Sequence, residues 1–435
     1  MKFKSRVIHG NCLNKMRTMP DNYVSAIVTD PPYGLSFMGK KWDYDVPSVE
    51  IWRECLRVLK PGGFLLSFAG TRTQHRMACN IEDAGFEIRD MIAWIYGSGF
   101  PKSLSVGKAV DKLQGNEREV VGTKTVKGGE NLNKISRENK NDSINAKGCG
   151  AYGKGAKQTN IEINDTKGTS DYEGWGTGLK PAMEPITVAR KPLSEKTVAK
   201  NCLKWGTGGI NIDACRVELN GDYKCKANGR PSQTGLDDNY ISEKANKPDD
   251  IGRFPANVIH DGSEEVTSLF PQTKSGKMKQ HIEGGIFNVY AKQCPRNVET
   301  IGDSGSAARF FYCAKASKSE RQLGCEDIYW LDGVLITKEL YDIFKAENES
   351  NRDNEEFIQH NIVHGNTHPT VKPISLMEYL IKLVSREGDL IMDPFAGSGS
   401  TGIAAQNLNR RFVLFEMEKE SVEICKRRLA GYRKS

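Results

Sequence analysis

The chain of 435 residues is long enough for one large core or for two to three ordinary domains, so burial alone can stabilise a fold. Hydrophobic residues make up 38% and charged residues 27%, and no apolar run approaches the roughly 20 residues that cross a bilayer. These values exclude a membrane protein, and the amino-terminal segment has no signal-peptide pattern, which predicts a cytoplasmic protein. The net charge of +7 is compatible with a polyanionic partner without requiring one.

The eleven cysteines are an odd number, scattered from Cys12 to Cys425. No pair has the CxxC spacing of a zinc or redox site. We therefore expect reduced thiols that mostly pack in the interior, and no metal site.

The first hundred residues alternate between apolar segments of strand length and helical patterns. Strands are predicted at 26–28, 64–66 and 91–95. Between the first two, the segment 52–59 has apolar residues at i, i+3, i+4 and i+7, which predicts a helix ended by Pro61-Gly62-Gly63. Strands joined through a helix are typical of a parallel sheet.

The tetrapeptide Asp30-Pro31-Pro32-Tyr33 follows the first of these strands, at the edge where open α/β sheets hold their ligands. Two prolines fix the backbone, so that the Asp30 carboxylate and the Pro31 carbonyl can be rigid acceptors aimed at one point. Two acceptors that hold the hydrogens of an aryl amine favour a nitrogen able to attack a methyl sulfonium. Tyr33 offers a ring face to a substrate base that has left the duplex stack.

The middle of the chain changes in composition from Gly97 to about Gly178, where Gly, Lys, Asn and Ser replace large apolar residues, as at 147–155. Such a stretch is not expected to form its own core, and is either a loop that orders on nucleic acid or a solvated insertion. Strands are predicted at 185–189 and 309–314, either to close the sheet or to build a second domain.

Basic and aromatic residues of the middle region are candidates for contacts with phosphate and flipped bases, although packing in the core explains each of them as well. They are Trp175, Trp205, Arg253-Phe254 and Phe310-Phe311-Tyr312.

The last seventy residues return to alternation. A helix is predicted at 376–384, a strand at 390–392 and a second strand at 412–415, followed by a helix patterned on residues 422–429. The segment Asp393-Pro394-Phe395-Ala396-Gly397-Ser398-Gly399 follows the first strand, and its glycines let the backbone approach a ligand.

Glu416 ends the second of these strands, near the spacing at which nucleotide-binding folds place a carboxylate on ribose hydroxyls. The loop at 393–399 lacks the GKS or GKT of a phosphate-binding loop, and its Asp-Pro-Phe opening departs from the GxGxxG of dinucleotide-binding enzymes. S-adenosyl-L-methionine, which has a ribose but no phosphate, fits this combination best.

The two motifs at 30–33 and 393–399 resemble the catalytic and cofactor motifs of DNA amino-methyltransferases. Their order, catalytic motif first and cofactor loop last, resembles the circularly permuted beta class of N6-adenine and N4-cytosine methyltransferases, of phage or restriction-modification type. The resemblance covers residues 1 to about 100 and about 365 to 435.

The resemblance implies an α/β fold, with a Rossmann-like, circularly permuted S-adenosylmethionine methyltransferase sheet and a large inserted target-recognition region. It implies a catalytic half at 1–100, a largely target-recognising insertion at 101–365 that also supplies some strands, and a cofactor-binding half at 366–435. Both ends must then share one sheet, with a strand near Val7 close to that at 412–415.

Two further segments match the family. Thr370 and Lys372, in His368-Pro369-Thr370-Val371-Lys372-Pro373, resemble the segment that borders the cofactor pocket. Asn11 and Cys12 resemble the family's Gly-Asp-Cys-Leu, with Asn11 where an acidic residue usually lies by the cofactor adenine; an amide can still hydrogen-bond there. Glu184 resembles part of a late sheet strand, without a catalytic role.

The expected partner is double-stranded DNA with a flipped target base, and a homodimer is possible. The chain has no Pro-Cys dipeptide, which disfavours ring-carbon methylation of cytosine. Family members with Asp at the position of Asp30 mostly modify adenine N6, so adenine is expected and N4-cytosine is the alternative.

Three other functions are alternatives. RNA or protein methyltransferases have similar proline turns, but their glycine loop normally precedes the turn. A non-catalytic DNA-binding protein leaves the cofactor loop unexplained. A fused nuclease would rest on Asp249 and Gln272-Thr273-Lys274, whose spacing is loose and whose surroundings are not strand-like.

Overall fold

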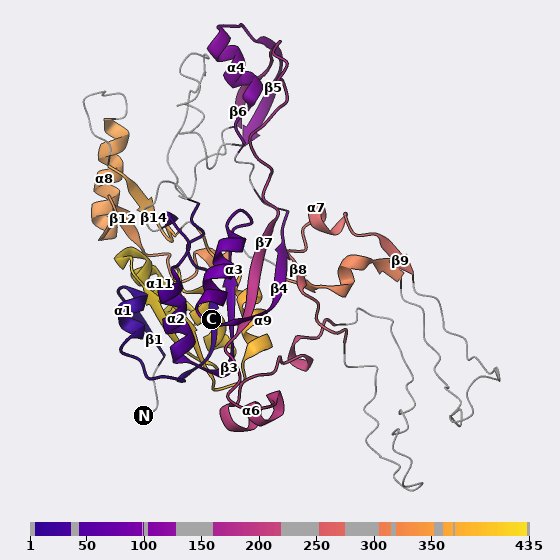
Figure 1. Cartoon of the computed structure of the whole chain (residues 1–435). Helices are drawn as coiled ribbons and strands as arrows, with labels where there is room; N and C mark the ends of the chain where they lie inside the picture. Colours follow the sequence, from indigo (N-terminus) through magenta and orange to yellow (C-terminus); the bar gives the residue numbers. More distant parts are fainter. Residues whose placement is uncertain are drawn as a thin grey trace, which may run out of the picture. The chain divides into compact units, whose positions relative to one another are not determined.

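The computed structural model describes residues 5–35, 43–97, 99, 103–127, 160–218, 252–274, 304–314, 319–351, 360–368 and 370–432 (Figure 1). By its internal contacts the chain divides into two compact units, Met1–Gly97 with Met183–Ser435, and Ser98–Ala182. These limits differ from the expected boundaries at residues 100 and 365, because the chain after Met183 returns to the larger unit. Within the described ranges, no helix is long and apolar enough to cross a membrane.

The larger unit is built on a nine-stranded sheet. Neighbouring strands are parallel except at β7, which is antiparallel to the strand on each side. The order is β1 (Arg6–His9), β16 (Arg411–Glu416), β15 (Leu390–Asp393), β2 (Val24–Thr29), β3 (Leu59–Phe68), β7 (Met183–Arg190), β4 (Glu87–Ile95), β8 (Val258–His260) and β11 (Tyr312–Cys313).

The two ends of the chain meet in this sheet. Val7 of β1 lies opposite Leu414 of β16, and Met392 of β15 lies opposite Ile27 of β2. The expected pairing of the strand near Val7 with the strand at 412–415 is therefore confirmed. An α/β sheet assembled from both termini is the fold class that the motif order predicted.

Helices cover both faces of the sheet, so its central strands are buried on both sides and contain continuous apolar runs. Ile27 faces one helical layer and its neighbour Val28 faces the other, as the two-residue period of a strand requires. One face packs against α1 (Cys12–Met16), α2 (Val49–Val58) and α3 (Gln74–Asp83), and the other against α9 (Ile374–Val384), α10 (Ser400–Asn407) and α11 (Lys419–Gly431) (Figure 1).

The predicted end of α2 was placed too late. The helix ends at Val58, and Pro61-Gly62-Gly63 lies inside β3. A contact distant in sequence explains this, because Asn201 of α6 (Val198–Trp205) donates to the Pro61 carbonyl at 2.8 Å and Gly62 N–H donates to the Lys191 carbonyl at 3.0 Å. The strand predicted at 309–314 was also too long, because residues 307–310 form a 3-10 turn and only Tyr312–Cys313 joins the sheet.

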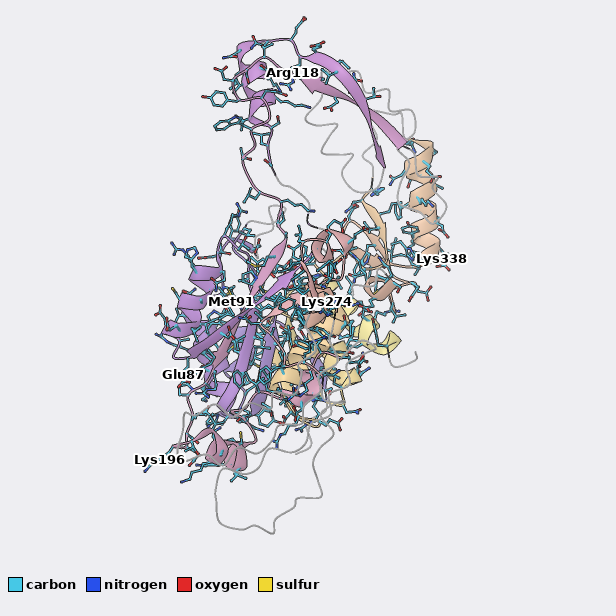
Figure 2. All side chains as sticks on the ribbon, turned by 90° about the vertical axis from the view of Figure 1, so that its right-hand side faces the viewer. Glu87, Met91, Arg118, Lys196, Lys274 and Lys338 are labelled. Carbon is cyan, nitrogen blue, oxygen red and sulfur yellow. The ribbon has the colours of Figure 1, made fainter. Side chains whose placement is uncertain are left out.

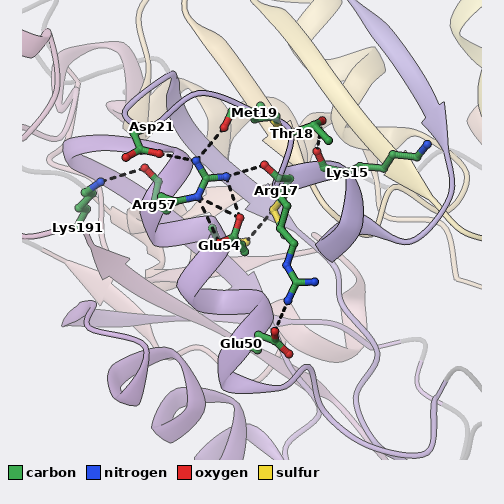
Figure 3. A network of polar contacts seen from close by, with 11 residues as sticks. Lys15, Arg17, Thr18, Met19, Asp21, Glu50, Glu54, Arg57 and Lys191 are labelled. Carbon is green, nitrogen blue, oxygen red and sulfur yellow. Dashed lines mark hydrogen bonds and ion pairs between the residues drawn. The ribbon is translucent and has the colours of Figure 1, made fainter.

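Arg57 at the end of α2 connects this helix to α1 and to the loop that follows α1 (Figure 3). Its guanidinium donates to the Met16 and Met19 carbonyls at 2.7 and 2.8 Å and pairs with Glu54 at 2.8 Å. Lys191 reaches the same region and donates to the Leu59 carbonyl at 2.7 Å. These bonds satisfy carbonyls at the end of α1 and so fix the loop that leads into β2.

The smaller unit contains α4 (Val106–Gln114) and an antiparallel pair of strands, β5 (Glu119–Lys127) and β6 (Asn160–Lys167). Its centre is polar: Arg118 pairs with the fully buried Asp111, with Glu173 at 2.8 Å, and with the Thr166 carbonyl at 2.9 Å (Figure 2). The composition did not predict these elements. The glycine-rich segment 147–155 lies outside the described residues.

A small antiparallel sheet precedes α9 in the chain. It belongs to the larger unit, where Cys325, Ile328 and Trp330 pack with Ile424 of α11. The sheet has three strands, in the order β13 (Val334–Ile336), β12 (Tyr329–Leu331) and β14 (Ile362–His364), and α8 (Lys338–Ser350) contacts it. Elsewhere in the larger unit lie α7 (Glu264–Thr267) and the antiparallel pair β9 (Gln272–Lys274) and β10 (Ser304–Ser306).

Candidate active site at the carboxyl edge of the sheet

The candidate site residues lie at one edge of the sheet. The parallel strands β2, β15, β16 and β4 end there, which places Asp30, Asp393, Glu416 and Tyr96 at that edge. Because β7 runs in the opposite direction, it begins at the same edge, and Glu184 lies opposite Trp94 near the end of β4.

A direct hydrogen bond joins the early proline turn to the late glycine loop. Thr29, the residue before Asp30, donates from its hydroxyl to Asp393 Oδ1 at 2.6 Å. Thr401 donates to the other carboxylate oxygen at 2.6 Å, and Phe395 N–H donates to Oδ1 at 3.0 Å. The two sequence motifs therefore form one site.

Asp393 is a brace rather than an exposed ligand group. Its side chain is buried, and burial raises the pKa of its carboxyl to about 6, although the three donors act in the opposite direction. Both oxygens accept hydrogen bonds from the protein itself. The sequence placed Asp393 in the cofactor site, whereas the structure places its carboxylate beneath the loop.

The glycine loop depends on left-handed backbone at two positions. Gly397 has φ +50° and Gly399 has φ +83°. A Cβ atom on Gly397 would lie 2.7 Å from His368 Nε2, and one on Gly399 would lie 2.5 Å from Cys425 Sγ. No side chain fits in either place without a shift of its neighbours.

The other loop residues are held by the surrounding helices and strands. Ala396 N–H donates to the Phe415 carbonyl at 2.9 Å, and the Phe395 ring lies edge-on to Trp52 at 6.3 Å. Arg428, fully buried in α11, donates to the Ser398 carbonyl at 2.8 Å. Pro394 is buried as well.

Glu416 ends β16 beside this loop. Its carboxylate accepts from Gly397 N–H and from Glu418 N–H, each at 2.8 Å, and burial raises its pKa. A carboxylate has about four lone-pair positions, so these contacts do not exhaust its capacity to accept from hydroxyl donors.

Asn11 and Cys12 lie at the start of α1. The Asn11 side chain caps the helix by accepting from Asn14 N–H at 3.3 Å, and Cys12 is buried. Burial raises the pKa of the Cys12 thiol to about 11, and the charges of Asp393 and Glu416 raise it further. Cys12 is therefore a neutral thiol beside the glycine loop.

The proline turn itself is fixed by a residue that the sequence did not single out. The Asp43 carboxylate accepts from the backbone N–H groups of Tyr33, Gly34 and Leu35 at 2.6, 2.9 and 3.2 Å. Pro31 is buried and Pro32 is half-buried. Asp43 thus gives the turn a second constraint besides its prolines.

Asp30 is engaged on both oxygens. The Tyr33 hydroxyl donates to Oδ1 at 2.7 Å, and the Lys372 ammonium donates to Oδ2 at 2.6 Å. Burial and the neighbouring charges of Asp30 and Glu184 raise the pKa of Tyr33 well above its usual value, so the phenol stays protonated. Lys372 was expected in the cofactor pocket, and in the structure its ammonium contacts the Asp30 carboxylate.

Lys372 also reaches Glu184 at 3.3 Å, and it lies 5.0 Å from the centre of the Phe68 ring. Burial lowers the pKa of Lys372, but the charges of Asp30 and Glu184 outweigh burial and raise it above its usual value. Lys372 is therefore a permanent cation. Sequence reasoning assigned no role to Glu184.

Tyr96 follows β4 and hydrogen-bonds to Glu184. Burial and the charge of Glu184 raise the pKa of its hydroxyl to about 12. The only sequence signal for Tyr96 was its place after a predicted strand.

The segment around Thr370 borders the glycine loop through His368. Thr370 is exposed, and its carbonyl accepts from His368 Nδ1 at 2.8 Å, which leaves Nε2 as an acceptor over Gly397. Burial lowers the pKa of His368 to about 4, so the ring is neutral at pH 7. Pro369 lies outside the described residues.

The aromatic candidates of the middle region mostly pack within the protein. Tyr312 stacks on Tyr379 with ring centres 4.0 Å apart, and Arg253 lies 4.9 Å from the centre of the Phe310 ring. Trp205 donates to Ser194 at 2.7 Å. Trp175, in the smaller unit, is exposed.

The nuclease hypothesis gains nothing from the structure. Gln272-Thr273-Lys274 forms the short strand β9, contrary to the expectation that its surroundings are not strand-like. Asp249 is outside the described residues. Among the residues that are described, no group of His, Cys, Asp and Glu could hold a metal ion.

With this geometry established, comparison with known proteins identifies the class. A family model described as DNA methylase, of the N6/N4 methyltransferase type, matches residues 24–427. The chain therefore belongs to the N6/N4 DNA methylase family, as the two motifs and their order predicted. Methylases of this family take their methyl group from S-adenosylmethionine, which is the cofactor expected for the glycine loop.

Individual relatives match over short stretches. The chain is 50% identical over 62 residues to the type II methyltransferase M2.DpnII of Streptococcus pneumoniae, and 45% identical over 62 residues to M.HindIII of Haemophilus influenzae. Each alignment covers 14% of this chain, and 23% and 20% of the respective relatives, about a fifth of their length. Their names support the expected restriction-modification type.

Solved structures align over nearly the whole chain at low similarity. The M1.HpyAVI–SAM complex aligns with 98% of each chain at 14% identity and a TM-score of 0.37. The cytosine-N4-specific PvuII DNA methyltransferase aligns with 98% of this chain and 87% of its own, at 12% identity and a TM-score of 0.40.

Proposed function

We propose that the chain transfers a methyl group from S-adenosylmethionine to the exocyclic N6 amine of adenine within a specific DNA sequence. The observation that carries this proposal is the 2.6 Å hydrogen bond from Thr29 to Asp393, which holds the proline turn next to the glycine loop. A methyl donor on the loop and a base amine at Asp30 would then be neighbours. Methyl transfer requires this proximity.

The residues of the loop suit the cofactor. Left-handed Gly397 and Gly399 keep side chains away from the loop surface, and Glu416 keeps acceptor positions for ribose hydroxyls. We assign Glu416 and the 393–399 loop to cofactor binding, with Asn11, Cys12 and Thr370 at the border of the pocket. When bound, the cofactor supplies a methyl group on a positively charged sulfur.

The proline turn suits an aryl amine. Asp30 is rigidly placed by Asp43 and by its neighbouring prolines, and accepts hydrogen bonds on both oxygens. In the proposed reaction the target amine takes the place of one of these donors, and the Pro31 carbonyl accepts its other hydrogen. The nitrogen lone pair is thereby directed at the methyl group, and preorganised acceptors stabilise the positive charge that grows on nitrogen.

Tyr33 is assigned to the face of the flipped base. Its ring lies 5.6 Å from the Lys372 ammonium, and its hydroxyl is anchored on Asp30 and Glu184. An anchored ring is a stacking platform that costs little ordering on binding.

The target base is assigned to adenine because the catalytic turn begins with Asp30. Incubating duplex DNA with labelled cofactor, followed by nucleoside analysis, tests this assignment. Label in N6-methyladenine is expected, whereas label in N4-methylcytosine alone would move the enzyme to the sister activity.

The natural partner is proposed to be double-stranded DNA with the target base flipped out, in the cytoplasm of a bacterial or phage-infected cell. Formation of a homodimer is a further part of this proposal. Methyl transfer to RNA or protein is the remote alternative, and comparing duplex DNA, RNA and protein as acceptors separates the three. Transfer to RNA alone would contradict a DNA substrate.

A further inference from the structure

Four side chains at the catalytic turn form a closed polar cluster: Asp30, Tyr33, Glu184 and Lys372. The Tyr33 hydroxyl lies 2.7 Å from Asp30 and 3.0 Å from Glu184. The Lys372 ammonium lies 2.6 Å from Asp30 and 3.3 Å from Glu184. Glu184 therefore shares with Asp30 both of the donors that occupy the catalytic carboxylate.

The target amine must compete with Tyr33 and Lys372 for the oxygens of Asp30. In the proposed reaction Asp30 must accept a hydrogen bond from the target amine, yet both of its oxygens already accept from donors of the protein. The side chain of Lys372 is only 8% exposed, and those of Asp30 and Glu184 are 19% and 20% exposed. Water is therefore a poor substitute partner for a displaced ammonium, and a buried cation without a carboxylate is costly.

We propose that Glu184 is a positioning residue for methyl transfer, which retains the Lys372 ammonium when the target amine takes its place on Asp30. This inference rests on the proposed function. Glu184 gives the displaced ammonium a second carboxylate within reach, so the amine can bind Asp30 without leaving Lys372 unpaired. Without that carboxylate, Lys372 stays on Asp30 and competes with the substrate.

Charge balance supports the same role. Two carboxylates and one ammonium leave a net negative charge among these three groups. As the methyl group passes to the amine nitrogen, the electron pair of the broken carbon–sulfur bond would stay on the donor's sulfur, and the nitrogen becomes positive until it loses a proton to Asp30 or to water. An excess negative charge nearby stabilises this positive nitrogen. Removing the charge of Glu184 alone leaves the cluster neutral and removes this stabilisation, whereas removing the charge of Lys372 as well restores the wild-type net charge.

The position of Glu184 depends on the reversed direction of β7. The strand enters the sheet between β3 and β4 and begins at the edge where its neighbours end. Tyr96 then hydrogen-bonds to Glu184 from the end of β4. A strand from the middle of the chain thus completes a cluster whose other members come from its two ends.

The test compares Glu184→Gln with Glu87→Gln in the full chain. Glu87 on β4 is a matched control, because it also pairs with a cation, Arg190 at 2.7 Å, but lies at the other end of the strand (Figure 2). Glu184→Gln is expected to lower kcat roughly ten- to hundred-fold, with KM for DNA and cofactor changed less than about three-fold. Glu184→Asp should recover part of the loss, and Glu87→Gln should stay within about two-fold of wild type.

A double-variant cycle separates positioning from a structural effect. If Glu184 acts through Lys372, Lys372→Gln with Glu184→Gln should lose little more activity than Lys372→Gln alone. Independent, multiplying losses would overturn the inference, and so would wild-type kcat in Glu184→Gln.

Different results would contradict the role of Glu184 and the proposed function. Asp30→Ala that retains wild-type turnover contradicts the proposed function. Asp30→Ala without turnover, together with a fully active Glu184→Gln, contradicts only the role of Glu184.

Discussion

Thr29 and Asp393 are separated by 364 positions in the chain, and the hydroxyl of Thr29 donates a hydrogen bond of 2.6 Å to the carboxylate of Asp393. Their strands, β2 and β15, are parallel neighbours in the sheet, with Met392 opposite Ile27. The bond therefore connects the ends of adjacent strands, each of which leads directly into one of the two functional turns. The relative position of the two turns is therefore set by two adjacent strands of the buried sheet.

Removing this bond should destabilise the protein. In Thr29→Val the buried Asp393 loses one of its two hydroxyl donors, and we expect a loss of about 1–3 kcal/mol in the free energy of unfolding, measured by urea denaturation. Thr29→Ser keeps the hydroxyl and should recover most of the loss. Equal stability of the Val and Ser variants would contradict the brace.

Asp30→Ala should abolish turnover while cofactor binding persists. The carboxylate accepts the target amine in the proposed reaction, whereas the glycine loop and Glu416 are untouched by the change. We expect a loss of roughly a hundred-fold or more in methyl transfer to DNA. Labelled transfer measures the rate, and calorimetry measures cofactor affinity.

Asp83→Ala is the control for that variant. Asp83 ends α3 on the surface, so its loss should leave both quantities near wild type. An active Asp30→Ala variant would mean that the reacting amine is held elsewhere.

Asp393 and His368 should give the stability opposite dependences on pH. Burial raises the pKa of Asp393 from 3.8 to about 6, so the folded protein binds this proton more tightly than the unfolded chain, and stability falls as pH rises between about 4 and 6. Burial lowers the pKa of His368 from 6.5 to about 4, so the unfolded chain binds that proton more tightly, and stability rises with pH between about 4 and 6.5. The two effects largely cancel in the wild type.

Single variants should uncover each effect. Relative to wild type, Asp393→Asn should gain stability as pH rises from 4 to 6, by an amount on the order of 2 kcal/mol. His368→Asn should gain relative stability as pH falls over the same interval. Denaturation of each cofactor-free protein at half-unit pH steps is the measurement, and parallel curves for both variants would contradict these assignments.

The sequence predicted those parts of the site that follow strands of strong apolar character. The strands at 26–28, 390–392 and 412–415 are buried on both faces, and their ends locate Asp30, the glycine loop and Glu416. The motif order then implied that both termini share the sheet. Local pattern and topology were sufficient to place these candidate residues at one edge of the sheet.

The contacts of Lys372 and Glu184 were not predictable in the same way. Lys372 lies outside any strand or helix, and Glu184 begins a strand whose direction is reversed relative to its neighbours. A strand pattern does not reveal direction, since both directions have the same two-residue period. The contacts of Asp43 were missed because no local sequence pattern predicts that its carboxylate accepts from the N–H groups of residues 33–35.

The glycine loop gives the last prediction. Gly397 combines a left-handed backbone with a neighbour, His368 Nε2, only 2.7 Å from where a Cβ would lie. Gly397→Ala should therefore cost about 1 kcal/mol or more for the backbone alone and should also push His368 and the loop apart. We expect cofactor affinity, measured by calorimetry, to fall at least about ten-fold.

Gly388→Ala is the matched control for this change. Gly388 has the same left-handed backbone, with φ +76°, but a Cβ there meets nothing within 4 Å. It should show a comparable backbone cost in denaturation and retain wild-type cofactor affinity. Because the contact of Gly397 is with the His368 ring, Gly397→Ala combined with His368→Ala should recover part of the lost affinity. If Gly388→Ala weakens cofactor binding as much as Gly397→Ala does, backbone strain alone is responsible, and the close approach to His368 does not shape the pocket.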